Sequence, residues 1–191
     1  MERPILFINA CVRKASRTRQ LAEQLLTRLQ QPYAEIRLHE MTFPVVNEDF
    51  LAQRDRLIAA GEFQSPVFDL ARQFAEAETI VIAAPYWDLS FPAALKQYLE
   101  QINVVGLTFR YTQEGVPLGL CRAGRLFFVT TAGGNYVPEE FGFGYIRALA
   151  RNYYGIDDVR LIQATGLDLE GADTDALVSA AAEAISGMDL D

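Results

Sequence analysis

Four short, almost continuously apolar runs place the strongest constraint on how this 191-residue chain can fold. They cover residues 5–10, 79–84, 125–131 and 159–164. Continuous runs of this length, unlike alternating ones, are typical of parallel strands that are covered on both faces. A fifth run, residues 33–38, alternates with polar residues and predicts an edge strand.

Amphipathic segments lie between these runs. Residues 18–29 place four leucines on one helical face, opposite a charged face. The same period predicts helices over 68–77, 92–102, 139–153 and 173–185, and a further helix over 48–60 within a long connection. Strand–helix alternation repeated five times predicts an α/β fold, a three-layer sandwich around a doubly wound parallel sheet. Right-handed crossovers and the polar second strand favour the strand order 2-1-3-4-5.

The remaining connections show no linker or repeat, so we expect a single domain over residues 1–191. A formal charge of −8 and an isoelectric point near 4.7 argue against nucleic acid and anionic membranes as partners. Two distant cysteines and one histidine, His39, predict no metal site and no disulfide framework. Free cysteines and the lack of a long apolar segment at the N-terminus favour a cytoplasmic protein. We expect His39 to lie on the surface.

Ligands of open α/β sheets bind beyond the carboxyl ends of the strands, where the strand order reverses. Three loops lie there in this chain. The first contains Ser16, which stands at the N-cap position of the first helix, and Thr18. Two hydroxyls, free helix N–H groups and nearby Arg and Lys residues suit a phosphate, although an ordinary capped helix with a solvated basic face fits the same residues.

The second and third loops are rich in aromatic residues and glycine, respectively. Residues 85–92 include Tyr86, Trp87 and Phe91, which could form a wall for a flat ring or pack inside the protein. In residues 130–136, Gly133 and Gly134 permit a close backbone approach to a ligand, or a plain turn. Each signal is weak alone, but all three fall on one edge of the predicted sheet.

These loops also carry a family resemblance. The stretch from Pro85-Tyr86-Trp87 to residues 92–96 resembles the flavin-ring loop of the NAD(P)H:quinone oxidoreductases. Residues 106–112, followed by Gly119-Leu120 and Gly124-Arg125, resemble the FMN-dependent NADH azoreductases. Residues 130–134 are similar to the glycine-pair loop of both groups, and residues 16–18 to their phosphate loop.

The resemblance implies a flavodoxin-like fold that binds FMN noncovalently, within a homodimer, and that uses NADH or NADPH to reduce a quinone, azo compound or related small aromatic acceptor. By position, Ser16, Arg17 and Thr18 would hold the phosphate, with Cys11 beside them as a small filler. The remaining implied contacts to the flavin are Pro85, Tyr86, Trp87, Asp88, Leu89, Thr131, Ala132, Gly133, Gly134 and Tyr136. The cofactor carries the hard chemistry, so no catalytic side chain is expected, and only Tyr136 is considered as a proton donor.

Two positions depart from the azoreductase pattern, which commonly has Asn at Asp88 and Arg at Ala132. A carboxylate near a reduced, anionic flavin disfavours that state, so we expect a different flavin potential and substrate preference. Two other functions remain open. One is a flavodoxin-type electron carrier that binds FMN without a substrate pocket, and the other is a binding module without flavin. A response-regulator-like switch is set aside because the strand ends lack clustered aspartates.

Overall fold

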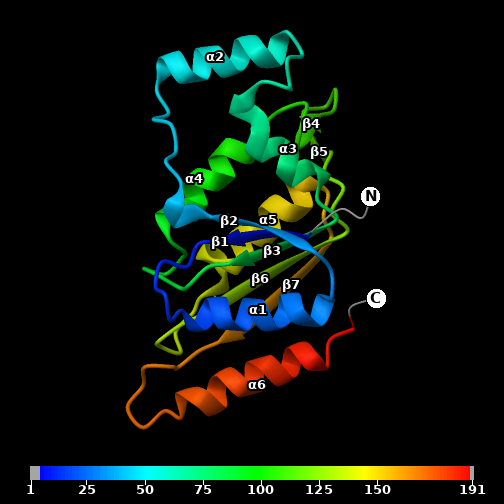
Figure 1. The fold of residues 1–191 in the computed structure, drawn as a ribbon. Helices are drawn as coiled ribbons and strands as arrows, with labels where there is room; N and C mark the ends of the chain where they lie inside the picture. Colours follow the sequence, from blue (N-terminus) through cyan, green and yellow to red (C-terminus); the bar gives the residue numbers. More distant parts are fainter. Residues whose placement is uncertain (1–4, 190–191) are drawn as a thin grey trace.

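The computed structural model describes residues 5–189 and shows a five-stranded parallel sheet in the predicted order (Figure 1). From edge to edge its strands are β2 (Tyr33–Arg37), β1 (Ile5–Asn9), β3 (Thr79–Ala83), β6 (Arg125–Thr131) and β7 (Asp158–Ala164). The predicted α/β class, the strand order 2-1-3-4-5 and the edge position of the polar strand are confirmed.

Helices cover both faces of the sheet and make three layers (Figure 1). α1 (Arg17–Leu29) and α6 (Thr174–Ser186) lie on one face, and α3 (Asp69–Glu76), α4 (Ala93–Ile102) and α5 (Phe143–Leu149) on the other. Neighbouring strand residues point to opposite faces: Ile5 and Phe7 join the core under α1 and α6, whereas Leu6 and Ile8 join the core under α3, α4 and α5. Burial on both faces explains why the strands read as continuous apolar runs.

One predicted helix is interrupted, and one hairpin was not predicted. The helix predicted over 139–153 is instead a 3₁₀ turn, η3 (Glu139–Phe141), followed by α5 and a π-helical turn, η4 (Ala150–Tyr154). Gly142, with φ −114° and ψ −98°, interrupts the helical backbone there. The segment 104–124 contains an unpredicted antiparallel hairpin, β4 (Phe109–Tyr111) and β5 (Pro117–Gly119), whose three-residue strands are too short to show a period.

The long connection after β2 contains α2 (Glu48–Ala59), close to its predicted bounds, between the short turns η1 (Leu38–Glu40) and η2 (Pro66–Phe68). α2 stands away from the sheet at the top of Figure 1, and none of its residues is buried. Arg54 ties it to the end of α4 by donating to the Asn103 carbonyl at 3.0 Å. Within residues 5–189, no helix is both long and apolar enough to cross a membrane.

Candidate functional site

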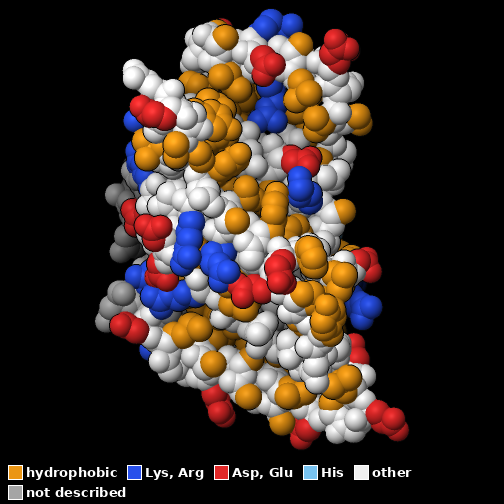
Figure 2. All heavy atoms as spheres, turned by 180° about the vertical axis from the view of Figure 1, so that it is seen from behind, with side chains coloured by type: hydrophobic (Ala, Val, Ile, Leu, Met, Phe, Trp, Pro, Cys, Tyr) orange, Lys and Arg blue, Asp and Glu red, His pale blue; other side chains and the backbone are white. Residues whose placement is uncertain are grey.

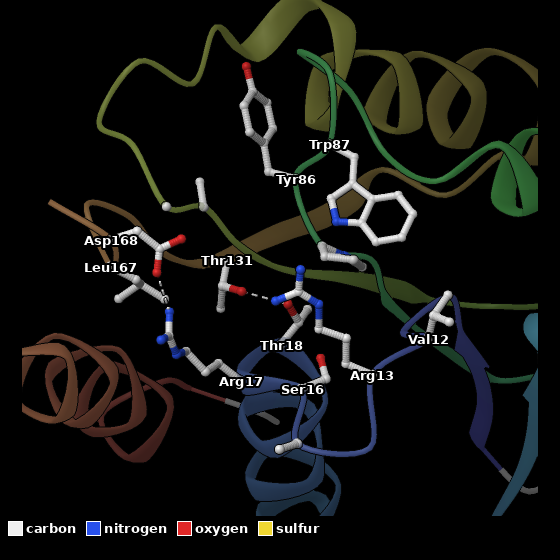
Figure 3. A pocket seen from close by; sticks show the side chains of 14 residues that line it. Val12, Arg13, Ser16, Arg17, Thr18, Tyr86, Trp87, Thr131, Leu167 and Asp168 are labelled. Carbon is white, nitrogen blue, oxygen red and sulfur yellow. Dashed lines mark hydrogen bonds and ion pairs between the residues drawn. The ribbon is translucent and has the colours of Figure 1, made fainter.

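A cavity of about 300 Å³ opens at the carboxyl edge of the sheet, where the strand order reverses. This volume is at the lower end of the range for small-molecule sites. Its walls come from the three predicted loops and from a fourth loop after β7 (Figure 3). The lining residues are Val12, Arg13, Ala15, Ser16, Arg17, Thr18, Pro85, Tyr86, Trp87, Thr131, Ala132, Gly133, Leu167 and Asp168.

The N-terminus of α1 forms one end of the cavity. Ser16 is the N-cap, as predicted, and its Oγ accepts a hydrogen bond from the Arg19 N–H at 3.3 Å. The Ser16 side chain also makes a hydrogen bond with the Cys11 thiol. The first turn of α1 carries no acidic residue, so its partial positive charge is not neutralised there. This end of the cavity suits an anion.

Two buried hydroxyl groups connect the end of the cavity that suits an anion to the last residue of β6. Thr18 and Thr131 are 1% and 9% exposed, and their Oγ1 atoms lie 2.6 Å apart. One hydroxyl must donate to the other, which leaves the second hydrogen free for a further acceptor. The pair fixes the spacing between the first and third loops.

Two guanidinium groups reach the cavity, and they differ in their partners (Figure 3). Arg17 Nη1 donates to Asp168 Oδ1 at 2.9 Å, an ion pair between partly exposed side chains. Arg13 extends into the cavity and makes no ion pair or hydrogen bond with any residue between 5 and 189. Arg13 is therefore the uncompensated cation of the site.

The backbone of the glycine pair lies at the edge of the cavity, which Gly133 lines, and its carbonyl groups are bonded to the fourth loop. The Gly133 and Gly134 carbonyls accept from the N–H groups of Asp168 and Gly166, both at 3.0 Å. A Cβ on Gly133 would lie 2.4 Å from Asp168 Oδ2, so the fourth loop packs directly against this backbone. Neither glycine N–H donates a hydrogen bond within the described chain, and both can serve an electron-rich ligand edge.

The aromatic loop ends in a tight, strained turn. The backbone N–H groups of Trp87 and Ser90 donate to each other's carbonyl groups, at 3.1 and 2.8 Å. Asp88 and Leu89 between them have φ values of 50° and 67°. Two positive φ values define a type I′ turn, which usually selects Asn-Gly. Ser90 Oγ also donates to the Phe141 carbonyl at 2.5 Å and so ties this turn to the loop after β6.

Replacing Leu89 by glycine should therefore stabilise the fold. The left-handed conformation costs a residue with a side chain about 1–2 kcal/mol, and glycine removes this strain. Glycine also loses more backbone entropy on folding, which offsets part of the stabilisation. Leu89→Ala is the matched control because it removes the same side chain but keeps the strain. We expect the glycine variant to exceed the alanine variant by about 1 kcal/mol in unfolding free energy, measured by urea titration. Equal stability would contradict the strained turn.

Tyr86 separates this cavity from a second one of about 150 Å³. The second cavity lies under the loop after β6, and its apolar walls include Phe128 and Phe143. The Tyr86 ring points away from α1 (Figure 3), and its buried Oη has no hydrogen-bond partner among residues 5–189. Burial, and next the phenol of Tyr136, raise the pKa of Tyr86, which keeps this group neutral.

The structure brings together most of the candidate residues from the first three loops. Those that do not line the cavity are Cys11, Asp88, Leu89, Gly134 and Tyr136. Asp88 and Leu89 are the tip of the turn beside Trp87, and Tyr136 is 77% exposed. The residues that sequence reasoning missed are Val12, Arg13, Ala15, Leu167 and Asp168. Arg13 could have been found from the basic residues that follow the first strand, but the loop after β7 contains no motif that points to a ligand. His39 is exposed, as predicted.

Cys11 is 3% exposed, and its Sγ lies 3.7 Å from the Ala83 carbonyl. Burial raises the pKa of its thiol to about 11, with a smaller opposing effect from Ser16. The thiol is therefore neutral at pH 7 and a poor nucleophile. Cys11 fits the predicted role of a filler beneath the loop.

The raised pKa of Cys11 predicts a loss of stability in alkali. The unfolded chain releases this proton near pH 9, whereas the folded protein retains it until about pH 11, so stability falls across that window. Cys11→Ala removes the effect, and the variant should lose about 2 kcal/mol less than the wild type between these pH values. Urea unfolding at several pH values tests this. Parallel pH profiles of the two proteins would refute it.

Comparison with known proteins places the chain in a family. A family model described as a flavodoxin-like fold matches residues 3–187. An FMN-dependent NADH:quinone oxidoreductase of Clostridium beijerinckii is 33% identical over 186 residues, covering 93% of each chain. A similarly named protein of Coprothermobacter proteolyticus is 32% identical over 174 residues, covering 86% of each.

Solved structures agree on the fold. An azoreductase from Bacillus anthracis superposes with a TM-score of 0.84 at 22% identity, covering 96% of this chain and 97% of that one. An FMN-dependent NADH-azoreductase of the same species, solved in complex with FMN, gives a TM-score of 0.80 at 22% identity, covering 96% and 95%. The chain therefore belongs to the flavodoxin-like family that includes the FMN-dependent NADH:quinone oxidoreductases.

Proposed function

We propose that this protein is an FMN-dependent oxidoreductase that uses NADH or NADPH to reduce a quinone, an azo compound or a related small aromatic acceptor. One observation carries the proposal: a single cavity combines an anion-binding end with an aromatic and N–H-rich end. The names of the full-length relatives, FMN-dependent NADH:quinone oxidoreductases, support the same chemistry.

The residues present fit FMN. Ser16, the α1 N-terminus and Arg13 would hold its phosphate, and the Arg13 guanidinium has no competing partner within residues 5–189. Trp87 would lie along the ring, and the free N–H groups of Gly133 and Gly134 would meet its polar edge. Arg17 would reach the phosphate only by sharing its guanidinium with Asp168.

Bound FMN supplies the hydride-accepting chemistry, and the chain supplies orientation and charge stabilisation. The N–H groups of Gly133 and Gly134 are fixed by the backbone, so they would stabilise negative charge on a bound flavin ring without reorganising. The neutral phenol of Tyr86 adds no charge beside the ring. No side chain is assigned as an acid or base, and Tyr136, at 77% exposed, is open to solvent.

An anaerobic absorption experiment tests this function. Purified protein, reconstituted with FMN, should show a flavin spectrum that bleaches on adding NADH or NADPH and recovers on adding benzoquinone. A flavin spectrum that stays oxidised with both nucleotides would favour an electron carrier instead. Failure to retain FMN at all would favour a binding module.

Asp88 should lower the potential of the bound flavin. A carboxylate at the tip of this turn disfavours a reduced, anionic ring, and through a partly solvated site the effect is on the order of tens of millivolts. Asp88→Asn should therefore raise the midpoint potential by that amount, measured by equilibration with a reference dye. Asp168→Asn is not a neutral control because Asp168 lines the cavity, so Asp175→Asn, on α6, serves instead. An unchanged or lowered potential in Asp88→Asn would contradict the assignment.

We further propose that the whole chain acts as one domain in a cytoplasmic homodimer. Large apolar side chains of the aromatic loop and of the segment after β6 are exposed in the single chain: Trp87, Leu89, Tyr136 and Phe141. Hydrophobic side chains also gather along one edge of the face in Figure 2 and over the β4–β5 hairpin. Exposed apolar area of this kind is typical of an interface. Light scattering on the reconstituted protein should give twice the mass of the 21.3 kDa chain, and the monomer mass would refute the dimer.

A further inference from the structure

A buried amide connects the edge strand β2 to the loop that leads into the cavity. Asn9, the last residue of β1, is 0% exposed. Its Oδ1 accepts from the Cys11 N–H at 2.9 Å, and its Nδ2 donates to Glu35 Oε1 at 2.8 Å. The other Glu35 oxygen, Oε2, accepts from Arg37 Nε at 3.0 Å. β1 and β2 lie side by side in the sheet (Figure 1).

The hydrogen bond to Glu35 sets the orientation of the Asn9 amide. The oxygen and nitrogen ends of an asparagine amide have almost the same shape, and their orientation follows from their hydrogen-bond partners. An ionised carboxylate only accepts hydrogen bonds, so it selects the NH₂ end. The Asn9 oxygen is then turned toward the Cys11 N–H. A peptide N–H held in this way fixes the direction in which the chain leaves the sheet.

That direction matters because the cavity begins immediately afterwards. Ala10 is still tied to β3 through its N–H, which donates to the Ala83 carbonyl at 2.8 Å. Cys11 is the next residue, and Val12, Arg13, Ala15 and Ser16 all line the cavity. Glu35 itself does not line it. An effect of Glu35 on the cavity must therefore pass through Asn9 and the loop, or through its charge.

We propose that Glu35, acting through Asn9, is a positioning residue for the phosphate-binding loop. This inference rests on the proposed binding of FMN at the cavity. Positioning and charge make opposite predictions. Removing a carboxylate near an anion site raises the local potential, which on charge alone tightens FMN binding. Loss of positioning loosens the loop and therefore weakens FMN binding.

The chain offers a matched control for this test. Glu40 also lies on this edge and accepts from Arg37 Nη1 at 3.4 Å, but it makes no contact with Asn9. Glu35→Ala and Glu40→Ala therefore remove the same charge from the same arginine. Glu35→Gln removes the charge but keeps an oxygen that can accept from Asn9.

The experiment measures dissociation constants for FMN and for riboflavin, which lacks the phosphate. Glu35→Ala removes a charge-assisted hydrogen bond from Asn9, and part of this loss reaches the loop, so the variant should bind FMN about five- to tenfold more weakly. Its riboflavin affinity should stay within about twofold of the wild type, as should FMN binding by Glu35→Gln and Glu40→Ala. Unchanged or tighter FMN binding by Glu35→Ala would overturn the inference, as would an equal loss for both flavins.

Hydrogen exchange of the flavin-free protein gives a second readout that does not depend on FMN. Amides over residues 11–16 should exchange faster in Glu35→Ala than in the wild type or in Glu40→Ala. Equal exchange in all three would refute the positioning role. Faster exchange in a protein that binds no FMN would instead refute only the proposed function.

Discussion

Replacing Arg13 by glutamine should weaken FMN binding by about tenfold or more while leaving riboflavin binding unchanged. Arg13 lines the cavity and has no partner in the described chain, whereas the neighbouring Arg17 is already paired with Asp168. A hydrogen-bonded contact between a guanidinium and a phosphate is charge-assisted and contributes about 1.5–3 kcal/mol. The chain as a whole has a formal charge of −8, so little other positive potential would compensate.

Lys14→Gln is the matched control. It removes the same charge one position further along the loop, but Lys14 does not line the cavity. Fluorescence titrations of the wild type and both variants with FMN and riboflavin give the six dissociation constants that are needed. A similar loss of FMN affinity in both variants would show a general charge effect and contradict the specific role of Arg13. A loss of riboflavin affinity would place Arg13 at the ring instead of the phosphate.

Replacing Gly119 by alanine should destabilise the fold by about 3 kcal/mol, since overpacking against rigid neighbours costs 1–3 kcal/mol and occasionally more. A Cβ at Gly119 would lie 2.2 Å from Gly155 N and 2.4 Å from the Tyr154 carbonyl oxygen. These are backbone atoms at the end of η4, and they cannot rotate away as a side chain would. Tyr154 is fixed further by a hydrogen bond from its Oη to Asn103 Oδ1 at 2.8 Å and by an edge contact with Phe74.

Gly124→Ala provides the comparison for this prediction. Gly124 follows the hairpin, but a Cβ there would meet no atom within 4 Å, and its φ is not in the left-handed region. Thermal unfolding should show a drop of many degrees in Tm for Gly119→Ala and almost none for Gly124→Ala. Equal Tm values would mean that the hairpin does not pack on η4 as described.

The sequence was sufficient for the sheet because its central strands, β1, β3 and β6, are buried on both faces. Leu6 and Ile8 point into one core and Ile5 and Phe7 into the other, so the run has no polar gap that could suggest another structure. The position of the cavity followed from the topology, since parallel strands carry their ligand loops at one edge. Ser16 was recognisable as an N-cap because this role depends on a residue only three positions away.

Features that depend on distant residues could not be predicted in this way. Asp168 reaches the cavity only because the loop after β7 pairs with the carbonyl groups of Gly133 and Gly134. The helical period over residues 139–153 hid a break at Gly142, where η3 ends and α5 begins. Asn9 and Glu35 belong to neighbouring strands, and their contact required the register of β1 and β2.

The most direct test of the central claim uses Trp87, the only tryptophan in the chain, which lines the cavity. Titrating flavin-free protein with FMN while recording tryptophan emission measures the affinity for FMN. It also tests whether the flavin binds next to Trp87. We expect strong quenching that saturates at one FMN per chain and is absent when FMN is replaced by inorganic phosphate. Binding that changes flavin fluorescence but leaves the Trp87 emission unaltered would place the flavin elsewhere and contradict this account.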